Sequence, residues 1–161
     1  MIAVISDTHM PKGGRVLPAR CVELLGEADA ALHAGDFITV ATLREIAALC
    51  PGPLHAVHGN VDEGELRSAL PETLEVELDG ARIAMIHDAG PSHGRLARMR
   101  GRFPRADAVV FGHSHLPLHE EEDGFQIFNP GSPTERRRAP RHSMAMLKVE
   151  AGRPVFEHVW L

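Results

Sequence analysis

The 161-residue sequence has no tyrosine and only one tryptophan, so aromatic residues make up just 4% of it. Its six phenylalanines and the tryptophan follow strand spacing, which fits core positions better than a platform for stacking nucleic-acid bases. No apolar run approaches the roughly 18 residues that a membrane-spanning helix needs. We therefore expect neither a membrane partner nor an aromatic surface that binds nucleic acid.

Cysteine is also scarce, because only Cys21 and Cys50 are present. Each lies within an expected helix, and neither has a second Cys or His at metal-ligand spacing. We expect two buried thiols rather than a disulfide or a metal site. An expected strand from residue 2 leaves no room for a signal peptide, and with the lack of a membrane span this predicts a cytoplasmic location.

The chain also lacks an excess of basic residues, since its formal net charge is −5. The net charge therefore gives no indication of a nucleic-acid partner. The charge is nevertheless uneven. Five arginines lie between Arg95 and Arg105, and four lie between Arg136 and Arg141. A solvated helix face and a basic loop are the favoured interpretation of these groups. The alternative is a rim that attracts an anionic substrate.

The chain does have the composition of an ordinary globular protein, with 43% hydrophobic and 24% charged residues, and we expect a single domain over residues 1–161. The hydrophobic pattern predicts strands at 2–6, 30–34, 54–58, 73–78, 81–87, 107–111, 116–120, 125–128, 143–150 and 155–160, and helices at 18–27, 40–50, 64–70 and 92–101. Helix–strand alternation followed by hairpins predicts an α/β fold. We expect a four-layer αββα sandwich of two mixed sheets flanked by helices.

Side chains that can bind metals follow five of the expected strands, at intervals of 24 to 29 residues. The five segments are Asp7-Thr8-His9, Gly35-Asp36, Gly59-Asn60, His87 and Gly112-His113-Ser114-His115. Ligands in α/β folds bind beyond the carboxyl ends of the strands, so one strand and one connection per segment lets all five converge. Two Asp, one Asn and four His are too many ligands for one metal and suit two.

This mixture of side chains suits catalysis rather than a structural metal. A carboxylate can bridge two cations, while imidazoles and an amide complete each shell without excess negative charge. Two divalent ions about 3.5–4 Å apart can hold a hydroxide and clamp both oxygens of an in-line phosphoryl displacement. No thiolate takes part, which favours an open, reactive centre.

The five segments resemble the pattern of the calcineurin-like metallophosphoesterase superfamily: Asp-x-His, Gly-Asp, Gly-Asn-x-Asp/Glu, a solitary His and Gly-His-x-His. The short length, Gly-Asn-Val-Asp at 59–62 and Asn129-Pro130-Gly131-Ser132 are similar to its small bacterial and archaeal phosphodiesterase branch. The resemblance implies one metal held by Asp7, His9, Asp36 and His115, and a second held by Asp36, Asn60, His87 and His113. Asp36 would bridge the two metals, Asp62 would orient a ligand, and the loop 129–132 would lie near the site.

The resemblance also implies a dinuclear phosphodiesterase in which a metal-bridging hydroxide attacks a small phosphodiester, with Asp36, Asn60 and His87 in catalytic roles. Among divalent transition metals we expect manganese first, with nickel, iron, cobalt and zinc as alternatives. The branch is similar to a retromer subunit that kept the fold as a protein-binding scaffold, so a metal-binding scaffold is one alternative function, and a nuclease is another. A homo-oligomer is left open.

Two departures from the pattern bear on the substrate. Many superfamily members have His after the Asn, but here Val61 stands there, so a general acid is missing from its usual place and a diester is favoured. Asp88 follows the solitary His, where Gly is common, and either orients a ligand or repels a dianionic phosphate. For substrate binding we expect His58, on the same strand face as Asn60, and Arg95, early in the helix expected at 92–101.

Overall fold

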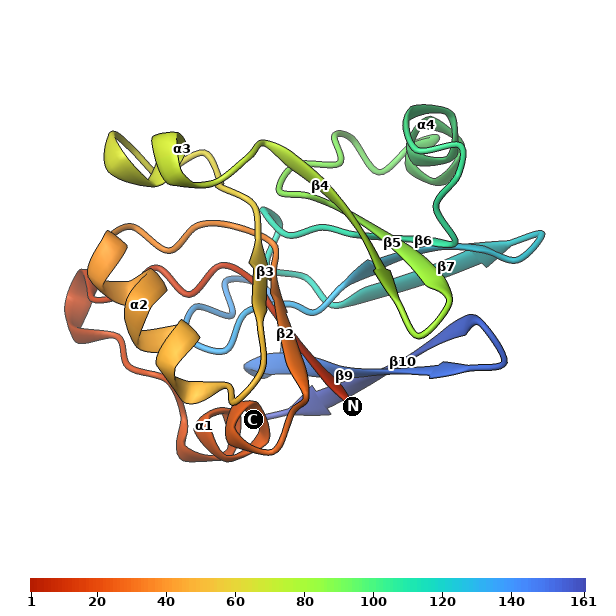
Figure 1. Ribbon diagram of the computed structural model, residues 1–161. Helices are drawn as coiled ribbons and strands as arrows, with labels where there is room; N and C mark the ends of the chain where they lie inside the picture. Colours follow the sequence, from red (N-terminus) through yellow and green to blue (C-terminus); the bar gives the residue numbers. More distant parts are fainter.

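The computed structural model describes residues 1–161 as two five-stranded sheets with helices on both outer sides (Figure 1). The strand order is β10-β9-β1-β2-β3 in the first sheet and β4-β5-β6-β8-β7 in the second. Each sheet combines parallel and antiparallel pairs. This confirms the expected four-layer αββα sandwich.

The elements follow the expected order closely. The strands are β1 (Ile2–Ile5), β2 (Ala30–His33), β3 (Leu54–Ala56), β4 (Thr73–Leu78), β5 (Ala81–Ile86), β6 (Ala108–Val110), β7 (Leu118–Glu122), β8 (Phe125–Asn129), β9 (Ser143–Glu150) and β10 (Arg153–Trp160). The helices are α1 (Ala19–Gly26), α2 (Val40–Leu49), α3 (Glu65–Ala69) and α4 (Arg95–Arg102), with a short 3-10 helix η1 (Lys12–Gly14) that the sequence did not predict.

The helix α4 begins three residues later than expected. Its N-cap is Gly94, which has a left-handed backbone (φ 66°), so the chain cannot be helical across that residue. The residues from Asp88 to Gly94 therefore form a loop that separates the end of β5 from the start of the helix. Because α4 starts later along the chain, its arginines lie at different positions relative to the end of β5.

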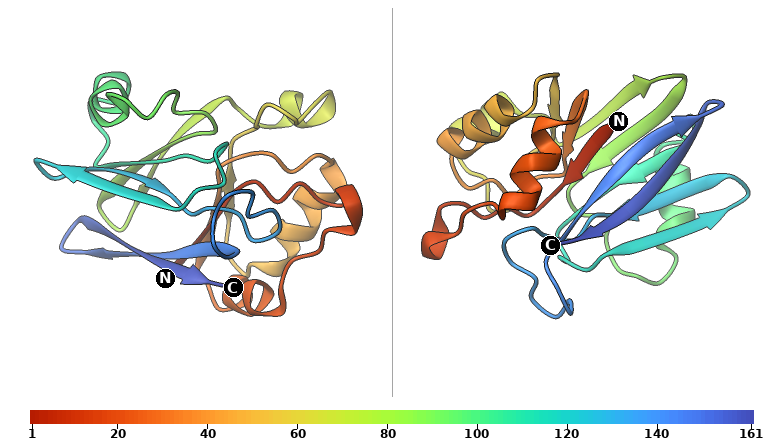
Figure 2. Two further views of the ribbon diagram at one scale, coloured as in Figure 1. Left: turned by 180° about the vertical axis from the view of Figure 1, so that it is seen from behind. Right: turned by 90° about the horizontal axis from the view of Figure 1, so that it is seen from below.

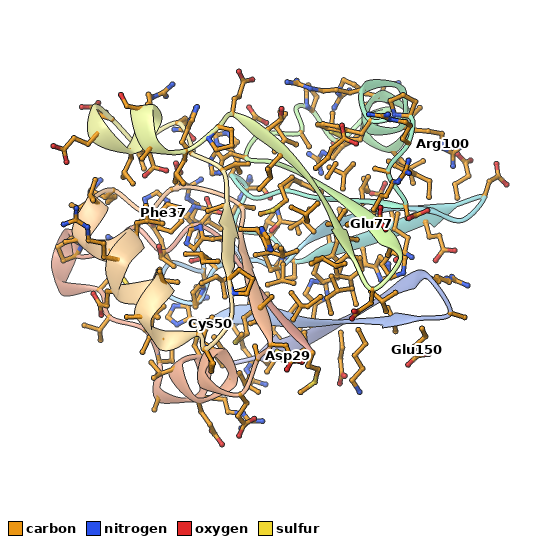
Figure 3. The ribbon with its side chains drawn as sticks, in the orientation of Figure 1. Asp29, Phe37, Cys50, Glu77, Arg100 and Glu150 are labelled. Atoms are coloured by element: carbon orange, nitrogen blue, oxygen red, sulfur yellow. The ribbon has the colours of Figure 1, made fainter.

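Three hydrophobic clusters hold the four layers together. Leu25 and Ile46 belong to the cluster between the first sheet and the helices α1 and α2, and Phe37 packs on the same side (Figure 3). A second cluster fills the space between the sheets, and a third lies under α4 and contains Met99 and Phe103. Figure 2 shows α1 and α2 on one side of the paired sheets and α4 on the other. The inner strands β1, β2 and β6 are buried along their whole length, which explains their continuous apolar sequences.

Both cysteines are free and buried, as expected. Burial raises the pKa of the Cys21 thiol to about 12, so this thiol stays protonated near neutral pH. No helix has both the length and the apolar character that crossing a membrane requires.

Strand register brings the expected ligand segments to one edge of the sandwich. Ile5 at the end of β1 pairs with His33, which in turn pairs with Ala56. In the second sheet, Met85 pairs with Val110, so β5 and β6 also end level with each other. Within each sheet, the segments after these strands therefore start side by side.

Candidate metal centre

Seven side chains from the ends of five strands meet at this edge, and we call them the metal centre. Asp7 and His9 follow β1, Asp36 follows β2, Asn60 follows β3, His87 follows β5, and His113 and His115 follow β6. The first four come from the first sheet and the last three from the second. All residues expected as metal ligands are thus brought together.

One group of donors forms around Asp7. The His115 Nε2 atom lies 3.2 Å from Asp7 Oδ1, and the Nε2 atoms of His9 and His115 are also 3.2 Å apart. All three side chains are buried, and their ligand atoms lie within 4.8 Å of one another. They form one candidate ion position.

A second group forms around Asn60. Its Oδ1 atom lies 3.0 Å from His87 Nε2 and 2.9 Å from His113 Nδ1. The His87 Nε2 atom is in turn 3.2 Å from Asp36 Oδ2. Asp7, Asp36 and His87 also form a compact buried set of ligand atoms.

Asp36 lies between the two groups, because its Oδ2 atom is 3.4 Å from His9 Nε2 and 3.2 Å from His87 Nε2. Two donors that bind one ion at about 2.1 Å and at right angles are roughly 3 Å apart. The observed spacings match that value around both groups. The donor set therefore fits divalent metal ions, with Asp36 placed where a bridging carboxylate would stand.

Hydrogen bonds to the backbone orient the histidine rings. His87 Nδ1 donates to the Ala34 carbonyl at 2.8 Å, and His115 Nδ1 donates to the Glu135 carbonyl. In each ring this leaves Nε2 as the atom that faces the acidic side chains. Such bonds fix the tautomer and make the ring a better metal ligand.

Asp62 supports the centre without facing it. The side chain is fully buried and accepts hydrogen bonds from the backbone N–H groups of Asp36 (2.9 Å), Gly59 (2.8 Å) and Ile38 (2.8 Å). It thereby links the segment after β2 to the segment after β3. This is the orienting role that the family resemblance implied.

The loop after β8 supports the centre from the other side. Asn129 Nδ2 donates to the Gly112 carbonyl at 2.8 Å, and Ser132 Oγ donates to the Asp7 carbonyl at 2.8 Å. These bonds tie the loop 129–132 to the segments that carry Asp7 and the two histidines after β6. The loop lies near the site, as expected.

Glycine is required at two motif positions because the ligands approach the backbone there. A Cβ atom at Gly59 would lie 2.0 Å from Asp36 Oδ1, and one at Gly112 would lie 2.5 Å from Asp7 Oδ2. Both distances are far shorter than any carbon–oxygen contact. The Gly-Asn and Gly-His motifs therefore leave room for the two carboxylates.

Five of the seven side chains extend from strained backbone. Their φ angles lie between 45° and 66°, in the left-handed region that residues with a Cβ atom rarely adopt. These residues are Asp7, His9, Asp36, His113 and His115. Strain of this kind clusters at functional sites.

Electrostatics within the centre favour a bound cation. Burial alone would raise the pKa of Asp7, but hydrogen bonds from His115 and His9 bring it well below its usual range. Burial opposes the charged form of His87, yet its hydrogen bond to Asp36 and the charges of Asp7 and Asp36 raise its pKa to about 9. In the metal-free centre an imidazolium thus balances the carboxylates, which is the role that a metal ion would take over.

Of the two residues expected to bind substrate, only His58 lies at the cavity beside the metal centre. His58 lines a cavity that also contains Asn60 and His87. Arg95 does not line it. The Arg95 guanidinium donates to the Gly90 carbonyl at 3.1 and 2.9 Å, and it lies over the Phe111 ring.

Arg102 is 46% exposed, as expected for a solvated helix face, and it also lines the cavity with His58. The cause is the loop 88–94, which carries the chain away from the metal centre before α4 begins. The other end of the helix then reaches Glu72, just before β4.

Two further residues near the centre were not predicted. Glu135 Oε2 lies 3.9 Å from His9 Nε2, and Glu135 Oε1 accepts an ion-pair contact from Arg15 at 3.0 Å. Both lie in irregular segments, Arg15 after η1 and Glu135 after the loop 129–132. No periodicity or motif marks such positions, so only the folded chain brings them to the ligands.

A family model agrees with this geometry. The model of the calcineurin-like phosphoesterase superfamily domain matches residues 1–152 of the chain. The chain belongs to the calcineurin-like phosphoesterase superfamily. This confirms the resemblance drawn from the five motifs.

Relatives within the superfamily come from archaea and bacteria, and the fold extends to eukaryotes. A probable metallophosphoesterase of Methanothermobacter thermautotrophicus is 32% identical over 85% of this chain and 79% of its own length. A phosphodiesterase of Methanocaldococcus jannaschii is 25% identical over 81% of this chain and 82% of its own. The crystal structure of Vps29 from Chaetomium thermophilum superposes with a TM-score of 0.80 at 22% identity, over 98% of this chain and 96% of the other, which shows a shared fold.

Proposed function

We propose that this calcineurin-like phosphoesterase is a dinuclear metal-dependent phosphodiesterase that hydrolyses a small diester. The observation that carries the proposal is the position of Asp36 Oδ2 between His9 Nε2 and His87 Nε2, at 3.4 and 3.2 Å. A carboxylate oxygen in that place can serve two ions at once. Manganese is the ion that we propose first.

Two divalent ions would supply an activated water and neutralise the charge that develops on phosphorus. Asp7, His9 and His115 would hold one ion, Asn60, His87 and His113 the other, and Asp36 both. Asn60 is exposed and His113 is half-buried, whereas Asp7 is fully buried. The substrate would therefore approach from the side of Asn60 and His113, where His58 is placed to bind it.

The preference for a diester rests on Val61, the residue after Asn60. The Val61 N–H group donates to Asp36 Oδ1 at 3.0 Å, so the backbone there is fixed against the bridging carboxylate. Its side chain is apolar and cannot donate a proton to a departing alkoxide. Esters with good leaving groups, among them activated diesters, depend least on such a donor.

The test measures metal-loaded protein with bis(p-nitrophenyl) phosphate as the diester and p-nitrophenyl phosphate as the monoester. The diester should be hydrolysed faster, and Asp36→Asn should abolish turnover while the circular dichroism spectrum stays unchanged. Val61→His should raise hydrolysis of an alkyl monoester such as glycerol 3-phosphate relative to the p-nitrophenyl diester, because it places an imidazole where a general acid can protonate the departing alkoxide.

Three results would contradict the proposal. A protein that binds two ions but hydrolyses neither ester would favour the scaffold alternative instead. Full activity in Asp36→Asn would exclude Asp36 as the bridging ligand. An unchanged ester ratio in Val61→His, with metal content preserved, would show that Val61 does not set the preference.

A further inference from the structure

A cavity of about 490 Å³ opens from the metal centre on the side of Asn60 and His87. We propose that this polar cavity binds the second ester group of the diester and that this group is a hydroxyl-rich alcohol, such as a polyol or a sugar. The proposal rests on the proposed phosphodiesterase function. The side chains that would contact the alcohol are His58, Arg67, Glu72, Asp88 and Arg102.

Three structural elements bring these side chains to the metal centre. Thr73 at the start of β4 pairs with Ile86 at the end of β5, so Glu72 lies beside His87. Arg102 at the end of α4 reaches Glu72, with 3.4 Å between its Nη2 atom and Glu72 Oε1. Arg67 extends from α3, directly after the segment that carries Asn60. An ester group of a phosphate bound at the metal centre would therefore extend into this cavity.

The charges of the polar cavity balance. Two guanidinium groups, Arg67 and Arg102, face two carboxylates, Glu72 and Asp88. A cavity without net charge has no general attraction for a second anionic group. It instead offers both hydrogen-bond donors and acceptors, which is what a hydroxyl group needs because it donates and accepts.

Apolar and aromatic ester groups fit the polar cavity poorly. Ile86 is the one hydrophobic residue in its lining, and no phenylalanine or tryptophan contributes. Sites for drug-like ligands are lined mainly by hydrophobic and aromatic side chains, and nucleobases are held by stacking on aromatic rings. The lining therefore selects against a lipid chain and against a nucleobase.

Arg102 is the member with the most freedom to bind a ligand. The Arg67 guanidinium is already engaged, because its Nε atom donates to the Asp62 carbonyl at 2.7 Å. Arg102 has one long contact with Glu72, and the two side chains are 46% and 71% exposed. Such an exposed pair contributes little to stability, so its partners can turn towards an alcohol at low cost.

The test measures binding by calorimetry to the full-length protein loaded with Mn²⁺. The probes are glycerol 3-phosphate and phenyl phosphate, which carry the same phosphate and differ only in the alcohol. Glycerol 3-phosphate should bind more tightly. Arg102→Ala should weaken its binding roughly tenfold, the size expected for one lost hydrogen bond to a charged group, and leave phenyl phosphate unchanged.

Arg105→Ala is the matched control, because Arg105 lies with Glu75, Glu77 and Arg82 in a separate cavity and should leave both affinities unchanged. Tighter binding of phenyl phosphate would overturn the proposal. An equal loss for both probes in Arg102→Ala would also overturn it, because Arg102 would then contact the phosphate itself.

Hydrolysis of p-nitrophenyl diesters, measured in parallel, separates this inference from the proposed function. A preserved preference for glycerol 3-phosphate without any hydrolysis would overturn the phosphodiesterase and leave the alcohol site standing. Hydrolysis without a preference between the probes would overturn the alcohol site alone.

Discussion

His33 lies directly beneath the metal centre and is fully buried. Its Nδ1 atom accepts a hydrogen bond from the Gly35 N–H group at 3.1 Å, and its Nε2 atom lies 3.2 Å from the Thr8 hydroxyl. It therefore connects the segment that carries Asp36 with the segment between Asp7 and His9. Burial lowers the pKa of this imidazole from 6.5 to about 3, so the folded protein holds it neutral.

This lowered pKa predicts how stability depends on pH. In the unfolded chain His33 binds a proton below its ordinary pKa of 6.5, whereas in the folded chain it does so only near 3. The free energy of unfolding should therefore fall as the pH drops through that interval, by up to about 1.4 kcal/mol per pH unit from this group. His33→Gln keeps a donor and an acceptor but does not titrate, so urea unfolding should show a shallower pH dependence.

His93→Gln is the matched control, because the His93 side chain is exposed and makes no hydrogen bond. It should leave the pH dependence of the wild-type protein unchanged. Parallel pH profiles for wild type and His33→Gln would contradict the assignment of His33 as a neutral, buried support of the centre.

Among the elements, the loop 88–94 is held by two arginines of the following helix. Arg98 donates to the carbonyls of Ala89 at 2.8 Å, Pro91 at 2.6 Å and His93 at 3.3 Å, while Arg95 donates to Gly90. Four backbone carbonyls that no strand or helix could satisfy thus gain partners. These two arginines of the cluster between Arg95 and Arg105 stabilise a loop.

Removing one of these arginines should destabilise the protein measurably. Arg98→Ala leaves several loop carbonyls without a protein donor, and we expect a loss of about 1–2 kcal/mol. Calorimetry should show a melting temperature lower by a few degrees. Arg44→Ala, at an exposed position of α2 where the side chain makes no hydrogen bond or ion pair, should cause no comparable change. Equal melting temperatures for the two variants would contradict this role of Arg98.

The same loop shows how far sequence reasoning extends. The strands and the expected ligand segments were predictable because each segment closely follows an apolar run. The start of α4 was not, because a left-handed Gly94 can be recognised only when the chain is folded. For that reason Arg95 holds the loop instead of lining the cavity, and Glu135 approaches His9 from a segment that carries no periodic signal.

At the scale of the whole molecule, the metal centre joins the two sheets. Asp7, His9, Asp36 and Asn60 follow strands of the first sheet, and the three remaining histidines follow strands of the second. The His113 N–H group also donates to the Asp7 carboxylate at 3.2 and 3.1 Å, so the sheets meet there even without an ion. Bound ions would add direct links between the two halves of the sandwich.

Metal binding should therefore stabilise the entire fold. At an ion concentration 100 times the dissociation constant, linkage gives about 2.7 kcal/mol, which corresponds to a rise in melting temperature of roughly 5–10 °C. The rise should shrink as the pH falls, because the ion next to His87 must displace the proton that His87 holds below about pH 9. Scanning calorimetry of manganese-loaded and chelator-treated protein, at pH 6 and pH 8, measures both effects.

Asp36→Asn serves as the control in that experiment, since it removes the carboxylate that faces both groups of donors. It should lose most of the metal-dependent rise. An equal melting temperature with and without metal in the wild-type protein would contradict the role of the centre as a link between the sheets.

The left-handed backbone of five candidate ligands has a consequence for selection. Each such residue with a Cβ atom costs about 1 kcal/mol, a cost that glycine avoids. A laboratory population selected only to survive heat in the absence of metal would gain by replacing these residues with glycine. The metal centre should then disappear before the hydrophobic core changes. Only a continuing demand for the chemistry of the centre keeps Asp7, His9, Asp36, His113 and His115 in the sequence.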